Sequence, residues 1–327
     1  MTGRRPQPPI GARAVPSDPP TGKDIRPVSF REAYLFGREH LAAAGVESAP
    51  IEAEVLLRHA ARLDRAGLYV RWTQPVSEAV WRRYVDLLEG RAAGRPTAYL
   101  VGEREFCGLG FAVDERVLIP RPETELLVDV ALEAIRGIAA PVVVDVGTGS
   151  GAVAVVLAVR RPDLRAYATD VSRAALEVAS GNARRHGVAS RVTLLAGHAL
   201  VPVIERGVRA HAVLANPPYV PRHARDELPA EIRDHEPPVA LLSEGPRGTE
   251  IHERIAFQAP RVLLPGGTLA MEVAAKWHQA QAVAELFEGL GFEHVRILRD
   301  LAGLERVVVG TWAIGRPTSD RSPTPTP

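Results

Sequence analysis

Apolar residues recur with the period of a helix over the first part of the chain, between residues 28 and 94. One stripe consists of Val80, Trp81, Tyr84, Leu87 and Leu88. Ser77 stands before this stripe as a candidate N-cap, and Gly90 follows it as a C-terminal stop. Segment 50–63 carries a second stripe of the same kind. These residues predict a small bundle of four or five helices.

From about Pro141 the apolar positions form short β-branched runs that alternate with helical patterns. A continuous run such as VVVDV is typical of a parallel strand buried on both faces. Strands are predicted at 141–147, 165–170, 191–197, 210–216 and 266–273, with helices at 151–161, 172–187 and 278–291. Two late runs, 294–300 and 306–312, have no helix between them, so we expect them to pair antiparallel. The alternation predicts an α/β fold with a doubly wound, Rossmann-like, seven-stranded sheet.

Composition divides the chain into five parts. Residues 1–27 and 315–327 are rich in proline with little to bury, so we expect disordered tails. Residues 28–94 form the predicted helical domain, residues 95–136 a linker with a hairpin, and residues 137–314 the α/β domain. No internal repeat interrupts this order.

The charge and the cysteine content narrow the class of protein. The formal net charge of +1 gives no general attraction to nucleic acid or to a membrane. Cys107 is the single cysteine, so the chain forms no internal disulfide and builds no zinc site on thiolates. The sequence lacks a run of 18 apolar residues and an apolar signal-peptide core. We therefore expect a cytoplasmic protein that uses no metal.

A glycine-rich loop, GTGSG, follows the first strand of the α/β domain and opens its helix, with Gly147, Gly149 and Gly151 in alternation. Such a turn lets the backbone approach a ligand and presents N–H groups of the helix start. Asp170 ends the next strand, where a carboxylate can accept both hydroxyls of a ribose. A dinucleotide site would need the spacing G-x-G-x-x-G. The loop therefore favours a cofactor without phosphate, such as S-adenosylmethionine, with Asp145 orienting its amino group through the loop backbone.

The tetrapeptide NPPY follows the fourth strand, at the sheet edge where the cofactor would lie. An amide or aromatic amine nitrogen is a poor nucleophile because its lone pair is delocalised. The Asn216 side-chain carbonyl and the Pro217 backbone carbonyl can accept its two N–H bonds and turn the lone pair toward a methyl group. Pro218 stiffens this arrangement, and Tyr219 can stack on a planar target. The pattern predicts an amino methyltransferase, whose target is either a glutamine amide or the exocyclic nitrogen of adenine.

Several longer stretches resemble the release-factor glutamine methyltransferases. They include residues 94–129, with the specific segment LIPRPETE, and the stretches VDVGTGSGAVAVVLA, NPPYV, HEPPVALLSEGPRG and GLERVVVG. The resemblance covers roughly residues 30–312. It implies a class I methyltransferase fold with an N-terminal helical substrate-binding domain. It also implies methylation of the glutamine in the Gly-Gly-Gln motif of class I peptide-chain release factors, by a monomeric enzyme that forms no stable complex with nucleic acid.

The resemblance assigns roles to individual positions. It implies that Phe106 is an aromatic wall of the active site, and that Glu236 and Pro237 shape the substrate loop. The family usually has an acidic residue and then a large one after the third core strand, where this chain has His198 and Ala199. The signature near the cofactor pocket consists of Arg121, Glu123 and Thr124. The implied cofactor residues are Gly147, Thr148, Gly149, Ser150, Gly151, Asp170, His198, Ala199 and Asn216, and the implied catalytic residues are Asn216, Pro217, Pro218 and Tyr219.

Three alternatives stay open at the level of sequence. An adenine-N6 methyltransferase acting on DNA or RNA would need a basic stripe or a recognition domain. A non-catalytic protein could retain the cofactor pocket, and a family member could act on a different protein glutamine. The N-terminal arginines that bear on the first alternative are interleaved with acids and comprise Arg58, Arg62, Arg65, Arg71, Arg82 and Arg83.

Overall fold

The computed structural model describes residues 29–313, which fall into two compact units that divide between Ala93 and Gly94. The two predicted tails lie outside the described residues. The first unit contains four helices within residues 29–93, in agreement with the predicted bundle. They are α1 (Phe30–Ala43), α2 (Ala49–Ala61), α3 (Arg65–Val70) and α4 (Glu78–Ala92).

The ends of α4 test the two predicted helix signals. Ser77 is the N-cap, and its hydroxyl accepts a hydrogen bond from the Val80 amide, so this prediction is confirmed. Gly90 does not stop the helix, which continues to Ala92. A helical glycine costs only about 1 kcal/mol, and the next residue, Arg91, is buried in an ion pair with Glu52 of α2. This tertiary contact outweighs the local preference.

The second unit is built on a seven-stranded sheet in the order β10-β11-β9-β6-β3-β4-β5. Strands β3 to β6 and β9 are parallel, and β10 and β11 pair antiparallel, as predicted. Strand β11 also pairs antiparallel with β9. The strands are β3 (Val142–Val146), β4 (Arg165–Asp170), β5 (Val192–Ala196), β6 (Ala210–Ala215), β9 (Leu263–Glu272), β10 (Phe292–Arg299) and β11 (Glu305–Trp312).

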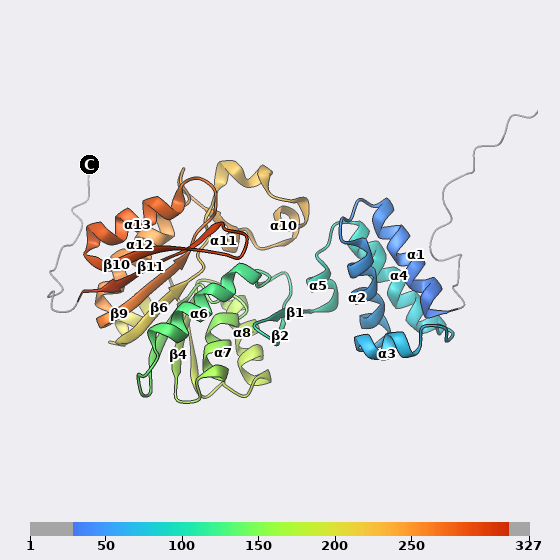
Figure 1. Cartoon of the computed structure of the whole chain (residues 1–327), viewed down its shortest axis with the longest axis horizontal. Coiled ribbons are helices and arrows are strands. Elements are labelled where there is room, and N and C mark those ends of the chain that lie inside the picture. Colours follow the sequence, from blue (N-terminus) through green and yellow to red (C-terminus); the bar gives the residue numbers. More distant parts are fainter. Residues whose placement is uncertain (1–28, 314–327) are drawn as a thin grey trace, which may run out of the picture. The chain divides into compact units, whose positions relative to one another are not determined.

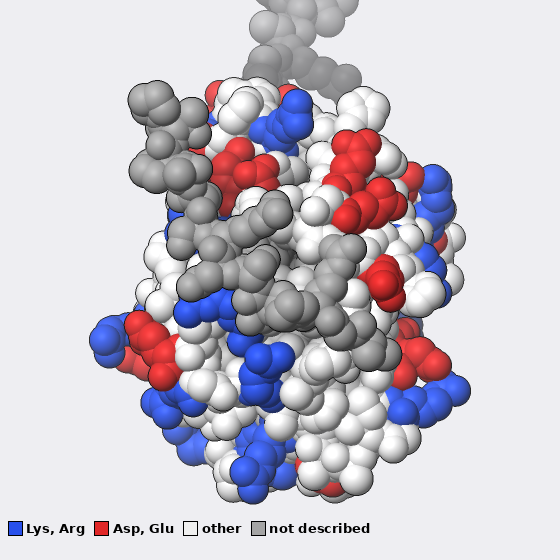
Figure 2. Space-filling view, turned by 90° about the vertical axis from the view of Figure 1, so that its left-hand side faces the viewer, with Lys and Arg blue, Asp and Glu red and all other residues white. Residues whose placement is uncertain are grey.

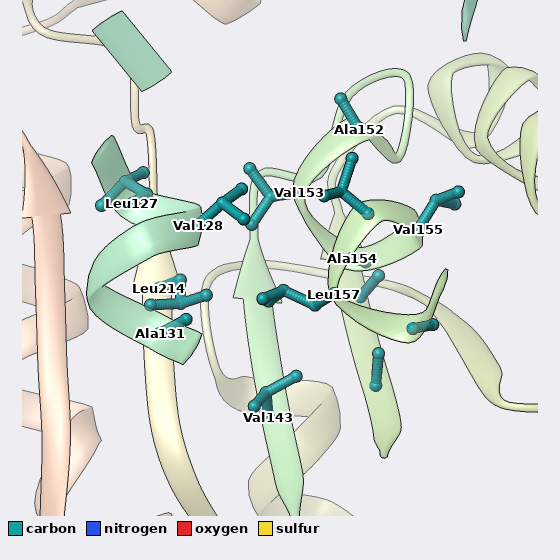
Figure 3. Packing of buried hydrophobic residues seen from close by; sticks show 14 of the residues in the cluster. Leu127, Val128, Ala131, Val143, Ala152, Val153, Ala154, Val155, Leu157 and Leu214 are labelled. Carbon is teal, nitrogen blue, oxygen red and sulfur yellow. The ribbon is translucent and has the colours of Figure 1, made fainter. Parts of the chain in front are cut away.

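Helices cover both faces of this sheet (Figure 1). Because side chains alternate along a strand, Val143 of β3 joins one hydrophobic cluster while Val144 and Val146 join the other. Figure 3 shows residues of the first cluster, with Leu157 above Val143, and Leu127 and Val128 on the neighbouring helix. Helices α6 (Glu125–Ala134), α7 (Ala152–Arg160) and α8 (Arg173–Arg185) contribute to this first cluster or lie beside it, whereas α9 (Val201–Glu205), α12 (Glu250–Gln258) and α13 (Gln279–Leu290) contribute to the second.

Short elements connect these layers. Residues 94–124 form α5 (Thr97–Val101), a hairpin of β1 (Glu103–Phe106) and β2 (Leu109–Ala112), and the 3-10 helix η1 (Pro122–Thr124). The segment between β6 and β9 pairs β7 (Val220–Pro221) with β8 (Leu242–Ser243). It also contains η2 (Arg222–Glu227), α10 (Ala230–His235), α11 (Pro238–Leu241) and η3 (Ala259–Arg261). No helix within residues 29–313 is both long and apolar enough to cross a membrane.

The packing of α1 against α4 generates a stability prediction. A Cβ added to Gly37 would overlap the hydroxyl of Tyr84, which is fixed by donating to the Ala53 carbonyl at 3.1 Å. Gly37→Ala should therefore lower the free energy of unfolding by about 2 kcal/mol, although alanine is the better helix former. Gly181→Ala in α8 is the matched control, because a Cβ there meets nothing within 4 Å. It should raise the free energy of unfolding by about 0.5–1 kcal/mol. Urea unfolding of both variants checks the pair, and equal effects would contradict the packing argument.

Candidate active site

The glycine loop is held against the end of β4. The amides of Gly147 and Thr148 both donate to the Thr169 carbonyl, each at 2.9 Å. Gly151 caps α7 with a φ of 82°, and a Cβ there would lie only 3.0 Å from the Ala179 Cβ of α8. Glycine at this position therefore allows both the left-handed turn and the close approach of the two helices.

Asp170 reaches the same loop from the end of β4. One carboxylate oxygen accepts from the Gly149 amide at 2.9 Å, and the other accepts from the Ser172 amide at 2.8 Å. Partial burial raises the pKa of this carboxyl, and the backbone donors oppose the shift. Since a carboxylate has about four acceptor sites, Asp170 keeps acceptor capacity for a further donor beside the loop.

Asp145 lies beneath the loop and is buried. Its Oδ2 accepts from the Thr148 hydroxyl at 2.6 Å and from the Ala154 amide at 3.3 Å. Burial raises the pKa of the Asp145 carboxyl to about 6. These bonds join the middle of the loop to the first turn of α7, so the carboxylate fixes the shape of the loop.

The NPPY segment lies beside the glycine loop because β6 pairs in parallel with β3, with Ala215 opposite Val146. The next residues along each strand are Asn216 and Gly147. A Cβ on Gly147 would lie 3.7 Å from the Asn216 carbonyl oxygen. The structure thus brings the predicted cofactor loop and the predicted catalytic segment together at one sheet edge.

Asn216 belongs to a chain of polar side chains from three elements. Its Nδ2 donates to the Thr124 hydroxyl oxygen at 3.1 Å, and that hydroxyl donates to Glu272 Oε2 at 2.6 Å. The Tyr219 hydroxyl lies 3.5 Å from Glu272 Oε1, at the outer limit of a hydrogen bond. Thr124, predicted from the signature segment, is the link between the tetrapeptide and a buried carboxylate.

Glu272 is fully buried at the end of β9, with 0% of its surface exposed. Burial raises the pKa of its carboxyl to about 7, and the negative charge of Glu123 adds to the rise. The Thr124 hydrogen bond, Arg306 and Tyr219 lower it. The pKa of the Tyr219 hydroxyl is also raised, mainly by burial and then by Glu272. Both groups therefore sit in a poorly solvated part of the site.

An ion pair joins the LIPRPETE segment to the segment HEPPVALLSEGPRG. Arg121 binds Glu236, whose second oxygen accepts from the Ile119 amide at 3.2 Å. Glu236 is buried while the guanidinium of Arg121 is partly exposed. The segment that starts with Glu236 and Pro237 is thereby fastened to LIPRPETE, 115 residues away in the chain.

Three predicted site residues, Phe106, His198 and Ala199, have no contact within the described part of the chain that supports their predicted roles. Phe106 is 1% exposed and packs edge-on against Phe111 in the hydrophobic core, so its role as a wall of the site stays a prediction that its burial does not favour. His198 is exposed, and its Nδ1 lies 3.1 Å from the guanidinium of Arg254, which donates to it. Ala199 is buried with a φ of 47°. No contact within residues 29–313 assigns His198 or Ala199 to a ligand.

Known proteins show the same two-part organisation. The model described as the PrmC N-terminal domain matches residues 32–102, and the methyltransferase small domain matches residues 122–232. The release factor glutamine methyltransferase of Moorella thermoacetica is 42% identical over 280 residues, 85% of this chain and 97% of that protein. The one from Bordetella pertussis is 44% identical over 265 residues, 80% of this chain and 94% of that protein. The chain belongs to the release factor glutamine methyltransferase family.

A solved structure supports the fold of this methyltransferase. The hMettl16 catalytic domain, in complex with MAT2A 3'UTR hairpin 6, has a TM-score of 0.52 and 18% identity. The match covers 70% of this chain and 82% of that chain. At this identity the likeness concerns the fold alone, and it agrees with the methyltransferase domain that the family model identifies.

Three buried polar residues of this methyltransferase were missed by sequence reasoning. Besides Glu272, Gln279 donates to the carbonyls of Tyr219 and Arg247 at 2.7 and 2.6 Å, and accepts from the Ala274 amide at 3.0 Å. Asn182 binds the backbone of Ala112 and the Ser150 carbonyl. In the sequence, each of these residues can be recognised only as a polar residue on an otherwise apolar face of a strand or helix.

The buried Glu272 generates a prediction about stability and pH. The folded carboxyl has a pKa of about 7 against an ordinary 4.5, so the folded state keeps a proton that the unfolded chain releases. The free energy of unfolding therefore falls as pH rises between these two values, by up to about 3 kcal/mol. Glu272→Gln removes this titration. Relative to the wild type, the variant should gain stability from pH 4.5 to pH 8.

Urea unfolding at several pH values measures this difference. The comparison with the wild type is needed because His252, whose pKa burial lowers to about 4, acts with the opposite sign over part of the same range. Glu288→Gln, an exposed position on α13, is the control and should give a flat difference. A flat difference for Glu272→Gln as well would contradict the raised pKa.

Proposed function

We propose that this enzyme transfers the methyl group of S-adenosylmethionine to the side-chain amide nitrogen of the glutamine in the Gly-Gly-Gln motif of class I release factors. The observation that carries the proposal is the adjacency of Gly147 and Asn216 at the carboxyl edge of β3 and β6. This adjacency supports the proposal, because a segment that holds the amide has to lie beside the loop that binds the cofactor. The names of the curated relatives support the substrate class.

The residues at the sheet edge fit this cofactor. Gly147 is exposed, so the backbone of the loop can approach a ligand. Asp170 lies at 2.9 Å from the Gly149 amide and retains acceptor sites for ribose hydroxyls. When bound, the cofactor supplies an electrophilic methyl group on a positively charged sulfur. Asp145 and Thr148 would keep the loop in the conformation that receives it.

The tetrapeptide would hold the target amide in place. The Asn216 Oδ1 and the Pro217 carbonyl would each accept one N–H of the glutamine, which turns the nitrogen lone pair toward the methyl group. As the new C–N bond forms and the S–C bond breaks, the nitrogen becomes acidic and its proton passes to water. Tyr219 would cover one face of the amide, and the Gln279 bond to its carbonyl fixes the backbone there. Metal ions have no role in this scheme.

The remaining alternatives receive less support. Figure 2 shows one face of the molecule, with basic side chains mainly over its lower part and acidic side chains mainly over its upper part. Adenine methylation on a nucleic acid would rest on a basic stripe or a recognition domain, and the formal net charge of +1 gives no general attraction to nucleic acid. The proposal places a monomeric enzyme in the cytoplasm, acting on a protein substrate. A family member redirected to another glutamine would use the same residues.

Mass spectrometry tests the proposal directly. A purified class I release factor incubated with this protein and S-adenosylmethionine should gain one methyl group on the Gly-Gly-Gln glutamine. A release factor in which that glutamine is replaced by glutamate should gain none. Asn216→Ala should reduce the rate of transfer by about 10²-fold or more, because it removes one acceptor that orients the amide. An unmodified wild-type glutamine, with cofactor binding intact, would exclude this substrate.

Cofactor and amide binding should separate between two variants. Asp170→Ala should raise the Kd for S-adenosylmethionine about tenfold or more, because a charged acceptor at the loop is lost. Asn216→Ala should leave that Kd within about threefold. Calorimetric titration of both proteins measures the two constants. Normal cofactor affinity in Asp170→Ala would show that the carboxylate does not contact the ribose.

A further inference from the structure

Glu272 is a buried ionisable group that the proposed transfer does not use. It has no exposed surface, and burial of a carboxylate is unfavourable unless strong donors compensate it. Its strongest donor is the Thr124 hydroxyl at 2.6 Å, and the same hydroxyl oxygen accepts from Asn216 Nδ2. A side chain of the catalytic segment is thus connected to the carboxylate through one shared hydroxyl.

The directions of these bonds follow from the chemistry of the groups. An ionised carboxylate only accepts, so the single proton of the Thr124 hydroxyl points to Glu272. The hydroxyl oxygen can then only accept from Asn216, and the amide must present its NH₂ group to Thr124. The amide oxygen of Asn216 consequently faces away from Thr124. This order depends on all three groups and not on Asn216 alone.

We propose that Glu272 and Thr124 are positioning residues that fix the orientation of the Asn216 side-chain amide, so that its oxygen faces the target nitrogen. The proposal rests on the proposed function, because it explains why the amide oxygen of Asn216, a hydrogen-bond acceptor, faces the nitrogen that receives the methyl group. An Asn216 amide turned by 180° would present N–H donors to the N–H donors of the substrate. The hydrogen bonds from Asn216 to Thr124 and from Thr124 to Glu272, called the relay below, therefore select a target that donates hydrogen bonds.

The charged groups around Glu272 determine the pH range in which the relay keeps the Asn216 amide oriented. Glu123 and Arg306 act on the carboxylate from η1 and β11, and Arg306 is itself paired with Asp300 at 2.8 Å. Tyr219 faces Oε1, and the buried His252 binds only the Glu272 backbone carbonyl, at 2.8 Å. A protonated Glu272 could donate to Thr124 and release its hydroxyl proton toward Asn216. The orientation should therefore weaken as the pH falls below about 7.

The chain offers an unusually clean probe of this orientation, because asparagine occurs only at positions 182 and 216. Protein labelled with ¹⁵N in the asparagine side-chain amide should give two pairs of proton–nitrogen signals. Asn182 is the internal control, since its NH₂ group donates to the Ala112 and Ser150 carbonyls at 3.0 and 2.8 Å, away from Thr124. The variants are Thr124→Val, which keeps the shape, and Thr124→Ser, which keeps the hydroxyl.

In the wild type, one Asn216 amide proton should exchange slowly with water and shift with pH around 7. Thr124→Val should speed this exchange about tenfold or more and leave the Asn182 signals unchanged, whereas Thr124→Ser should resemble the wild type. Glu272→Gln should abolish the pH-dependent shift. Unchanged Asn216 signals in Thr124→Val, equal changes in Thr124→Ser, or equal changes at Asn182 would each overturn the proposal.

Kinetics on the release factor provide the second measurement. Thr124→Val should lower kcat about 10- to 100-fold with KM and cofactor Kd within about threefold, and Thr124→Ser should recover most of the rate. In an Asn216→Ala background, Thr124→Val should add no further loss, because the two residues act as a unit. Additive losses would overturn the relay. A wild-type protein that methylates no release factor would refute the proposed function, and the amide signals would still decide the relay.

Discussion

The position of β6 between two parallel neighbours is the constraint on which the active site depends. Its last residue, Ala215, lies opposite Val146 of β3 on one side and Met271 of β9 on the other. The three residues that follow these partners are Gly147, Asn216 and Glu272, so the predicted cofactor loop, the proposed amide-holding segment and the buried carboxylate form one row at the sheet edge. Since side chains alternate along a strand, a slip of one residue in either ladder would turn one member of the row to the wrong face.

Two buried carboxylates organise this edge in the same way. Asp145 on β3 accepts the Thr148 hydroxyl, and Glu272 on β9 accepts the Thr124 hydroxyl, both at 2.6 Å. Burial raises the pKa of each carboxyl, to about 6 and about 7 respectively. Hydrogen bonds to ionised groups are short and strong, but a buried charge still lowers stability. The fold therefore gives up some stability near neutral pH, and in return the loop and the tetrapeptide are held rigidly.

Sequence patterns predicted the sheet, its antiparallel edge and the contiguity of the glycine loop with NPPY, because period and strand order determine which loops share an edge. They did not predict Glu272, which reads as one polar residue in an apolar strand. Its partner Thr124 is 148 residues away, and only the register of β6 against β9 brings the two together. Gln279 and Asn182 were missed for the same reason. Gly90 was misread as a helix stop, since local preference was overruled by the buried Arg91 ion pair.

The proposed substrate also explains why several contacts from different elements hold the segment after NPPY in place. A glutamine amide and an adenine amino group both offer two N–H bonds, so Asn216 and Pro217 alone cannot distinguish them. Discrimination then falls to the shape of the residues around the tetrapeptide. The fold fixes that shape at three points: the Arg121–Glu236 ion pair, the β7–β8 pairing, and Gln279 on the carbonyls of Tyr219 and Arg247. Each of these ties starts from a different element, so the segment cannot shift at one without straining another. A fixed set of neighbours around the tetrapeptide would discriminate between targets by size, and a glutamine side chain is smaller than an adenine base.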